Sequence, residues 1–160
     1  MSIRSRAEKT AEQLINKVKT NDLSAVVNYL KINVTKEKFA NKISGVFYKI
    51  DEKFFIGVNE DHPEQRQRFT IAHEIGHYCL HEASFFHYDH EKKEGELFFR
   101  AEDRISLDEV EANHFAAALL MPRKLIEEDF LKNQSVSFLA SKYKVSEDAM
   151  RYRLINLGLM

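Results

Sequence analysis

The residues whose types and spacing best suit chemistry are His73, Glu74 and His77, which form an H-E-x-x-H pattern. On a helix, two imidazoles four residues apart lie on one face, about 6 Å apart along the axis. Zinc binds neutral histidine nitrogens at roughly 2.0–2.1 Å, so both side chains can converge on one ion. Glu74 then stands beside the ion, where a carboxylate can accept a proton from water that the ion activates. Because so short a pattern also arises by chance, the surrounding sequence must decide its meaning.

A catalytic zinc site usually needs a third protein ligand, and the nearest candidate, His81, does not fit. His81 continues the four-residue spacing, but it lies about 12 Å from His73 along the helix axis and is rotated by about 80°. One small ion cannot reach His73, His77 and His81 together. The longer H-E-x-x-H-x-x-G-x-x-H pattern is also absent, because Leu80 replaces its glycine and Ala83 its third histidine. We therefore place His81 near the cleft or the helix end.

A better third ligand lies in the segment SLDEVEANHFAAALLMP, which begins at Ser106 and has helical periodicity. Glu109 and Asn113 share one face of this helix with small alanines, while Glu111 points roughly the opposite way. The alanines would let this helix approach the histidine helix. Glu109 would then complete the zinc shell, and Asn113 would hold the far nitrogen of a ligating histidine. The alternative is that Ser106 and Glu109 form a capping box, which needs no metal.

The segments before the H-E-x-x-H pattern predict two helices and then a small sheet. Residues 3–19 and 23–30 carry apolar side chains at helical spacing. Residues 34–58 are rich in β-branched and aromatic side chains that alternate on either side of Asp51-Glu52, which predicts a hairpin. This order puts a strand beside the histidine helix, where its main chain can bind an extended peptide.

The start of the histidine helix and the segment after it have weaker local signals. Asp61 and Glu64 match a capping box that would begin the helix. Residues 83–100 are charged and aromatic, and their histidines His87 and His90 favour a solvated surface loop. A lid over the metal site is the alternative for this segment.

Composition and charge limit the class of protein. The chain has 160 residues, of which 44% are hydrophobic, enough for one compact domain with a sizeable core. Its formal net charge of −1 excludes a strongly basic nucleic-acid-binding protein. The amino terminus lacks an apolar signal segment, and no run approaches the roughly 18 apolar residues of a membrane span. The single cysteine, Cys79, stands at core spacing and predicts a buried thiol in a reducing cytoplasm.

The carboxyl-terminal segment, residues 135–159, predicts a helix, a short turn and a second helix, as in a helix-turn-helix. Ser146 suits the N-cap of the second helix, and Gly158 suits its end. Glu147 and Asp148 open the second helix and would repel phosphates, which favours a packing or substrate-recognition element over DNA binding. If the segment did enter a major groove, its basic residues would make the contacts: Lys142, Lys144, Arg151 and Arg153.

The chain resembles the ImmA/IrrE family of zinc metallopeptidases. The matching pieces are RQRFTIAHEIGHYCLH at 66–81, FFR at 98–100 and EVEANHFAAALLMP at 109–122. The resemblance implies an α+β, thermolysin-like (gluzincin) fold, in which a small, mostly antiparallel sheet packs on the H-E-x-x-H helix and a helical tail follows. We expect a zinc metallopeptidase domain at 1–125 and a helix-turn-helix-like segment at 126–160, packed on the same core.

The resemblance also implies a ligand set and a substrate class. Zn²⁺ would be held by His73, His77 and Glu109, with Asn113 where related enzymes carry Asp or Asn. Members of the family resemble proteases that cleave repressors of mobile genetic elements, or that act as switches in stress responses. The expected partner is therefore a cytoplasmic protein, a helix-turn-helix repressor, and no membrane partner is expected.

Two functions stay open at this point. In a zinc endopeptidase, Glu74 would accept a proton from water and pass it to the leaving amine, while a further donor stabilises the oxyanion. In the rival hypothesis, the chain is a DNA-binding or stress regulator with a structural or sensory zinc site, and its DNA binding would depend steeply on salt. The sequence does not choose among the candidate oxyanion donors: Tyr78, His81, His87, Tyr88 and His114.

Overall fold

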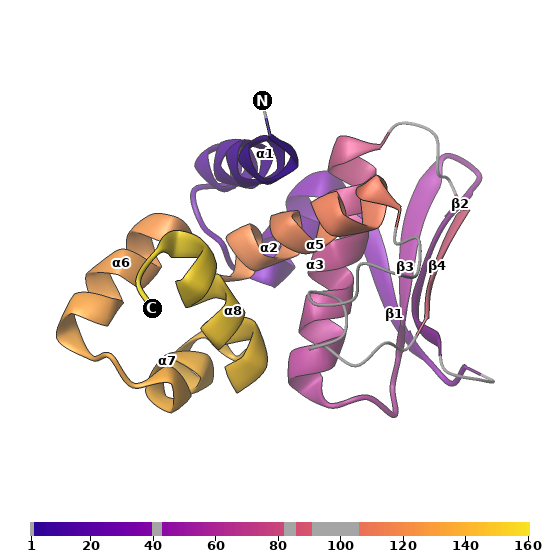
Figure 1. The fold of residues 1–160 in the computed structure, drawn as a ribbon. Coiled ribbons are helices and arrows are strands. Elements are labelled where there is room, and N and C mark those ends of the chain that lie inside the picture. Colours follow the sequence, from indigo (N-terminus) through magenta and orange to yellow (C-terminus); the bar gives the residue numbers. More distant parts are fainter. Residues whose placement is uncertain (1, 40–42, 82–85, 91–105) are drawn as a thin grey trace.

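A four-stranded sheet lies at one side of the molecule, and helices cover one of its faces (Figure 1). The computed structural model describes residues 2–39, 43–81, 86–90 and 106–160. Helix α3 (Glu64–Leu80) lies beside the sheet, and α5 (Leu107–Leu120) lies next to α3. Within the described ranges, no helix combines the length and the apolar character that crossing a bilayer requires.

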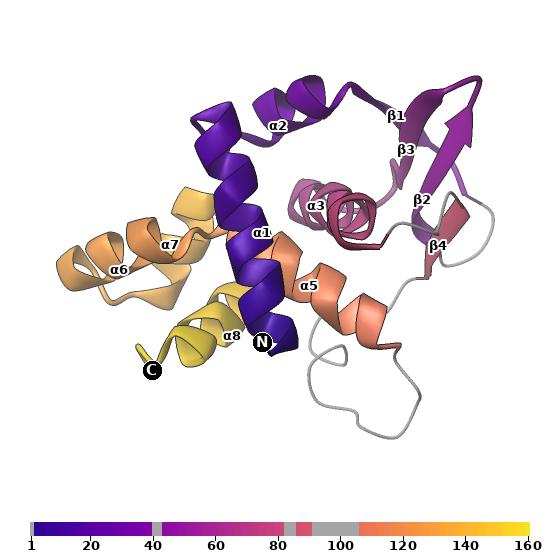
Figure 2. The ribbon, with the colours of Figure 1, turned by 90° about the horizontal axis from the view of Figure 1, so that it is seen from above.

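The two amino-terminal helices match the two predicted ones. Helix α1 (Ile3–Val18) begins at Ser2 and α2 (Leu23–Leu30) begins at Asp22, and each cap accepts a backbone N–H from the first turn of its helix. Such caps satisfy donors that the helix itself leaves unpaired. Figure 2 shows α1 crossing α5, and the residues that α1 buries there and in the rest of the core are Ala7, Ala11 and Leu14.

The sheet is mixed, with two antiparallel pairings and one parallel pairing. Strands β2 (Ile43–Ile50) and β3 (Lys53–Asn59) form the predicted hairpin. Its turn residues, Asp51 and Glu52, both have positive φ (46° and 62°), as a two-residue hairpin turn requires. Strand β1 (Ile32–Glu37) pairs parallel to β3. The strand order β1-β3-β2-β4 leaves β1 and β4 at the edges.

Strand β4 (Phe86–His90) corrects one prediction. It pairs antiparallel with β2, so the loop predicted over 83–100 is wrong for these five residues. The sequence FHYDH has no apolar run that would mark it as a strand, and it forms one by pairing with β2, a tertiary interaction. The rest of that segment, with the FFR motif, lies outside the described residues.

Side chains between the sheet and α3 supply much of the core. Phe47 of β2, Ile56 of β3 and Ile75 of α3 are each at most 2% exposed and belong to one buried cluster. Fully burying a side chain of this size contributes about 1.5–3 kcal/mol. The sheet is therefore held firmly against the helix that carries His73 and His77.

Helices α3 and α5 lie so close together that a side chain at residue 76 would press against the backbone of α5. A Cβ atom at Gly76 would lie 3.1 Å from the Cα and carbonyl oxygen of Ala112 and 3.1 Å from Phe115. Small residues at such a crossing let two backbones approach, as the alanines of α5 led us to expect. The first turn of α5 is thereby brought over the histidines of α3.

The start of α3 differs from the prediction. Its N-cap is Pro63, which makes no side-chain capping hydrogen bond, so the capping box of Asp61 and Glu64 is wrong. Pro63 keeps an extended backbone with ψ of 151°, and the helix therefore begins at Glu64. Glu64 still lies in the first turn, where a carboxylate interacts favourably with the helix dipole.

Three short helices complete the chain on the side of α5 away from the sheet (Figure 1). They are α6 (Arg123–Lys132), α7 (Val136–Tyr143) and α8 (Glu147–Leu157). As predicted, Ser146 caps α8, and Gly158 ends it with a positive φ of 72°. The division at residue 125 falls inside α6 and stays a prediction. The buried apolar residues that these helices and the turn between α7 and α8 add to the common core are Ile126, Leu139, Ala140, Val145, Ala149, Met150 and Leu154.

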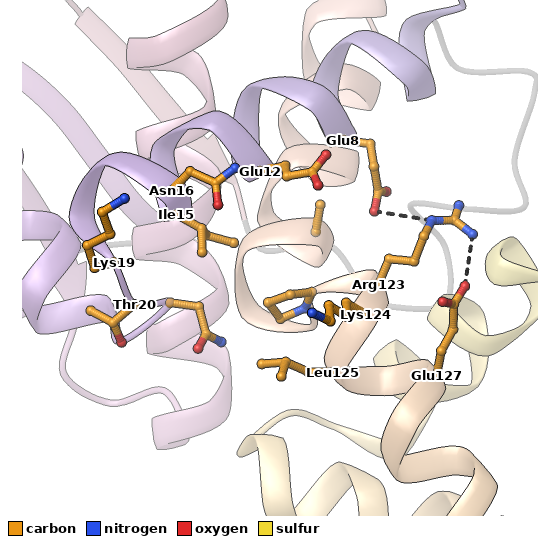
Figure 3. A pocket seen from close by; sticks show the side chains of 13 residues that line it. Glu8, Glu12, Ile15, Asn16, Lys19, Thr20, Arg123, Lys124, Leu125 and Glu127 are labelled. Carbon is orange, nitrogen blue, oxygen red and sulfur yellow. Dashed lines mark hydrogen bonds and ion pairs between the residues drawn. The ribbon is translucent and has the colours of Figure 1, made fainter.

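An ion pair joins α1 to these carboxyl-terminal helices. The guanidinium of Arg153 in α8 is 2.7 and 2.8 Å from the two carboxylate oxygens of Glu8 in α1, and its Nε donates to the carbonyl of Met121 at 2.9 Å. Arg153 is only 4% exposed. Figure 3 shows Arg123 of α6 between Glu8 and Glu127, at 4.0 and 3.3 Å. Glu8 therefore fastens two carboxyl-terminal helices to α1.

We expect Glu8→Gln to lower the free energy of unfolding by about 2–4 kcal/mol, because it leaves the buried Arg153 without its carboxylate. Burial raises the pKa of Glu8, but the hydrogen bond and charge of Arg153 and the charge of Arg123 outweigh it, so the pKa lies below 4.5. The stabilisation is thus fully present above pH 4.5 and is lost as the pH falls through the lower, folded-state pKa.

Urea unfolding at pH 7 and near pH 3 tests this expectation, with the exposed Glu12→Gln on the same helix as the control. The difference between wild type and Glu8→Gln should shrink at the lower pH. A difference that stays constant with pH, or equal losses in the two variants, would contradict the assigned ion pair.

Gly76→Ala should lower the free energy of unfolding by about 1–3 kcal/mol, because the added methyl group meets the backbone of α5. In the middle of a helix this exchange normally stabilises by about 1 kcal/mol, so the sign itself is informative. Chemical denaturation measures it. A variant as stable as wild type, or more stable, would show that the two helices have room to separate.

Candidate metal centre

Three donor side chains from two helices meet where α3 and α5 lie together. The Nε2 atoms of His73 and His77 are 3.0 Å apart. Glu109 faces both, with Oε1 at 3.1 Å from Nε2 of His77 and Oε2 at 3.5 Å from Nε2 of His73. Ligands at about 2.0–2.1 Å from a tetrahedral zinc lie about 3.3 Å from one another, so these spacings fit one ion. We call these three residues the donor cluster; among the described residues, no other group of His, Cys, Asp or Glu converges in this way.

Helix α3 presents the two histidines of the donor cluster on the face that it turns toward α5. Their ring centroids are 4.7 Å apart, with the rings close to perpendicular, and both side chains are 3% exposed. The four-residue spacing places them on one face, and packing fixes their rotamers. Their nitrogens are therefore held close together by the packing around α3.

Glu109 occupies the first turn of α5, where the structure shows the Ser106 half of the predicted capping box. Ser106 is the N-cap of α5, and its hydroxyl accepts the backbone N–H of Glu109 at 3.3 Å. That bond uses the main chain of Glu109 and leaves its carboxylate directed at the histidines. Its side chain is 18% exposed, more than either histidine, so the cluster is most accessible on the carboxylate side.

Asn113 holds the far nitrogen of His73, as the sequence predicts for a supporting residue. Its Oδ1 is 2.8 Å from Nδ1 of His73, and Asn113 is 2% exposed. When Nε2 binds a metal, Nδ1 carries the proton and donates it to such an oxygen. Asn113 lies one helical turn after Glu109, so one face of α5 carries both the candidate ligand and the residue that contacts His73.

The far nitrogen of His77 is held by a longer chain of contacts that sequence reasoning missed. Nδ1 of His77 is 3.1 Å from Nδ1 of His81, and Nε2 of His81 is 3.0 Å from Oε2 of Glu111. Arg6 of α1 then contacts both carboxylate oxygens of Glu111, at 3.0 and 3.2 Å. Glu111 points away from the donor cluster, as expected, but it is only 5% exposed. The four-residue spacing between His77 and His81 was a local sequence signal for the contact between them. No local sequence signal pointed to Arg6.

Glu74, the candidate proton acceptor, lies beneath the sheet. It is fully buried, and a Cβ atom at Gly45 of β2 would lie 3.9 Å from its Oε1. The same Cβ atom would clash with the side chain of Thr70, so the strand can approach α3 here only because residue 45 is glycine. The carboxylate next to His73 is thus kept from bulk water by the backbone of β2.

The structure places the candidate oxyanion donors in different surroundings. Tyr78 packs against Phe47 and Phe54 in the core. His114 stacks on Tyr152, and burial, together with nearby positive charges, lowers the pKa of its imidazole. The side chains of His87 and Tyr88 lie outside the described residues, so the identity of the donor stays a prediction.

Two further features lie apart from the donor cluster. Cys79 is partly buried rather than fully buried as predicted, and this burial raises the pKa of its thiol to about 12, so the thiol stays protonated at neutral pH. A cavity of about 500 Å³ lies between α1 and α6, with Glu8, Ile15 and Arg123 in its wall (Figure 3). No residue of the donor cluster lines that cavity.

Comparison with known proteins identifies the family to which this chain belongs. Residues 27–155 match the model of the IrrE N-terminal-like domain, a peptidase family. The chain is 32% identical to immunity region protein 2 of Bacillus phage phi105 over 130 residues, which are 76% of this chain and 75% of that protein. It is 26% identical to metallopeptidase ImmA of Bacillus subtilis (strain 168) over 145 residues, which are 87% of this chain and 78% of that protein. This chain therefore belongs to the ImmA/IrrE family of metallopeptidases.

Proposed function

We propose that this metallopeptidase is a cytoplasmic zinc endopeptidase that cleaves a transcriptional repressor of a mobile element or of a stress response. The observation that carries the proposal is the meeting of His73, His77 and Glu109 beside the buried Glu74. Such an arrangement provides three candidate ligands where α3 meets α5 and, next to His73 in the sequence, a carboxylate that can accept a proton, which is what metal-assisted hydrolysis requires.

The types of donor favour zinc. Two imidazole nitrogens and one carboxylate oxygen are a common catalytic set for zinc, with a position left for water or substrate. With neutral imidazoles, they leave the site with a formal charge of +1 when zinc is bound, which favours Lewis-acid chemistry. Asn113 supports one histidine from behind at 2.8 Å, as is usual for ligating histidines.

The proposed mechanism divides the work between the ion and the protein. When bound, zinc supplies a Lewis acid that polarises the scissile carbonyl and increases the acidity of water. Glu74 accepts the proton of the water that attacks the peptide bond, and then delivers that proton to the leaving nitrogen. Burial of Glu74 under β2 keeps its carboxylate from exchanging protons with bulk solvent.

The sheet and the relatives support a protein substrate. Strand β4 lies at the edge of the sheet, next to the strand that covers Glu74. Edge strands bind extended peptides through main-chain hydrogen bonds, which hold a scissile bond without requiring one particular sequence. One relative is named for the immunity region of a phage, and this name supports a repressor of a mobile element as the substrate.

The carboxyl-terminal helices are poorly suited to the alternative, DNA binding. Of the four predicted DNA contacts, Arg153 is buried against Glu8, and Lys142 lies 2.6 Å from Asp129. Glu147 lies in the first turn of α8, in the position that would approach the phosphates. We therefore assign α7 and α8 to packing or substrate recognition.

Glu74→Gln should retain zinc and lose hydrolysis of the repressor by about 10²–10⁴-fold, because an amide cannot accept the proton of water. The assay is cleavage of a candidate helix-turn-helix repressor, purified or co-expressed, with and without a chelator. Cleavage by wild type that chelator does not affect, or undiminished cleavage by Glu74→Gln, would contradict the proposed chemistry. Steeply salt-dependent, sequence-selective DNA binding without cleavage would support the regulator instead.

Glu109→Gln should weaken zinc binding by more than roughly 100-fold, beyond what the loss of a supporting hydrogen bond costs. Competition with a chromophoric chelator measures the affinity. The matched control is Asp108→Asn in the same turn, whose side chain is 63% exposed. Equal affinities of the two variants would remove Glu109 from the ligand set.

A further inference from the structure

In the hydrogen bonds that begin at the far nitrogen of His77, the chemistry of each partner determines which group donates and which accepts. A histidine that binds metal through Nε2 carries its proton on Nδ1, so His77 donates to Nδ1 of His81 at 3.1 Å. His81 must then accept at Nδ1, and its own proton lies on Nε2. That proton points at Oε2 of Glu111, 3.0 Å away, and an ionised carboxylate can only accept. Every donor in the series points away from the metal site.

Arg6 supports this series from another helix. Its Nη1 atom lies 3.0 and 3.2 Å from the two oxygens of Glu111, and its Nη2 atom donates to the carbonyl of Leu80 at 2.8 Å. The Leu80 carbonyl belongs to the last residue of α3 and has no acceptor role inside the helix. One guanidinium thus holds both Glu111 and the end of the helix that carries the histidines.

We propose that Arg6, Glu111 and His81 are positioning residues, which orient His77 and fix its tautomer for the metal. The inference rests on the zinc site of the proposed function. Glu111 is the partner of His81 rather than the nearby Asp108, because Glu111 is closer (3.0 against 3.6 Å) and its side chain is far less exposed (7% against 63%). The support reaches α1, which lies outside the residues 27–155 that match the family.

Zinc affinity of the full chain, measured by chelator competition, tests the proposal without any substrate. His81→Ala and Glu111→Gln should each weaken zinc binding by roughly 10–100-fold, as the loss of an outer partner of a ligating histidine does. Arg6→Ala should weaken it less, and Lys9→Ala, which removes an exposed cation from the same helix, should leave it unchanged. Circular dichroism confirms that each variant is folded.

The double variant separates positioning from a general loss of structure. If Glu111 acts through His81, adding Glu111→Gln to His81→Ala causes no further loss of affinity. Losses that multiply, single variants with wild-type affinity, or a wild type that binds no zinc would each overturn the proposal. Should His81→Ala fail to fold, Arg6→Ala takes its place in the double-variant comparison with Glu111→Gln, because the side chain of Arg6 is half-exposed.

The tautomer of His81 gives a second readout. In the zinc-loaded protein, ¹H–¹⁵N NMR of the imidazole rings should find the proton of His81 on Nε2, and Glu111→Gln should reduce that preference. A proton on Nδ1 of His81 in the wild type would overturn the proposal. The proposed function is tested separately. If the variants show the expected zinc affinities but the protein cleaves no repressor, the positioning residues are supported and the repressor is rejected as the substrate.

Discussion

The close approach of α3 and α5 is the constraint on which the metal site depends. The donors come from two helices that are separated in sequence, and donor atoms that lie 3.0–3.5 Å from one another tolerate little displacement of either helix. Gly76 against Ala112 sets that separation through backbone contact rather than through an adjustable side chain. The sheet fixes α3 from its other side, where Gly45 lets β2 lie over Glu74.

Helix α1 connects parts of the molecule that otherwise have separate tasks. Arg6 contacts Glu111 behind the histidines, whereas Glu8 binds Arg153 among the carboxyl-terminal helices. The two side chains are only two residues apart, so they leave the helix in different directions. A single helix thereby joins the support of the metal site to the packing of α6 and α8.

Much of this arrangement could be predicted from local spacing, and the remainder depends on tertiary contacts. The four-residue step between His73 and His77, and the same step between Glu109 and Asn113, place side chains on one helix face whatever the rest of the fold. The hairpin could likewise be predicted, because apolar side chains alternate on either side of Asp51-Glu52. By contrast, Arg6 meets Glu111 across 105 positions and Arg153 meets Glu8 across 145, distances at which no periodicity carries information. Strand β4 likewise forms by pairing with β2, a contact between segments far apart in the sequence.

The position of α1 also shows that the segment matching the family model and the segment forming the folded core have different bounds. The segment that matches the family model begins at residue 27, yet the core already contains Ala7, Ala11 and Leu14. A fragment cut to the shared boundaries would expose the apolar surface that these residues cover and would leave Arg153 buried without its acid partner. The portion of this chain that matches the family model is therefore shorter than the portion that folds around one core.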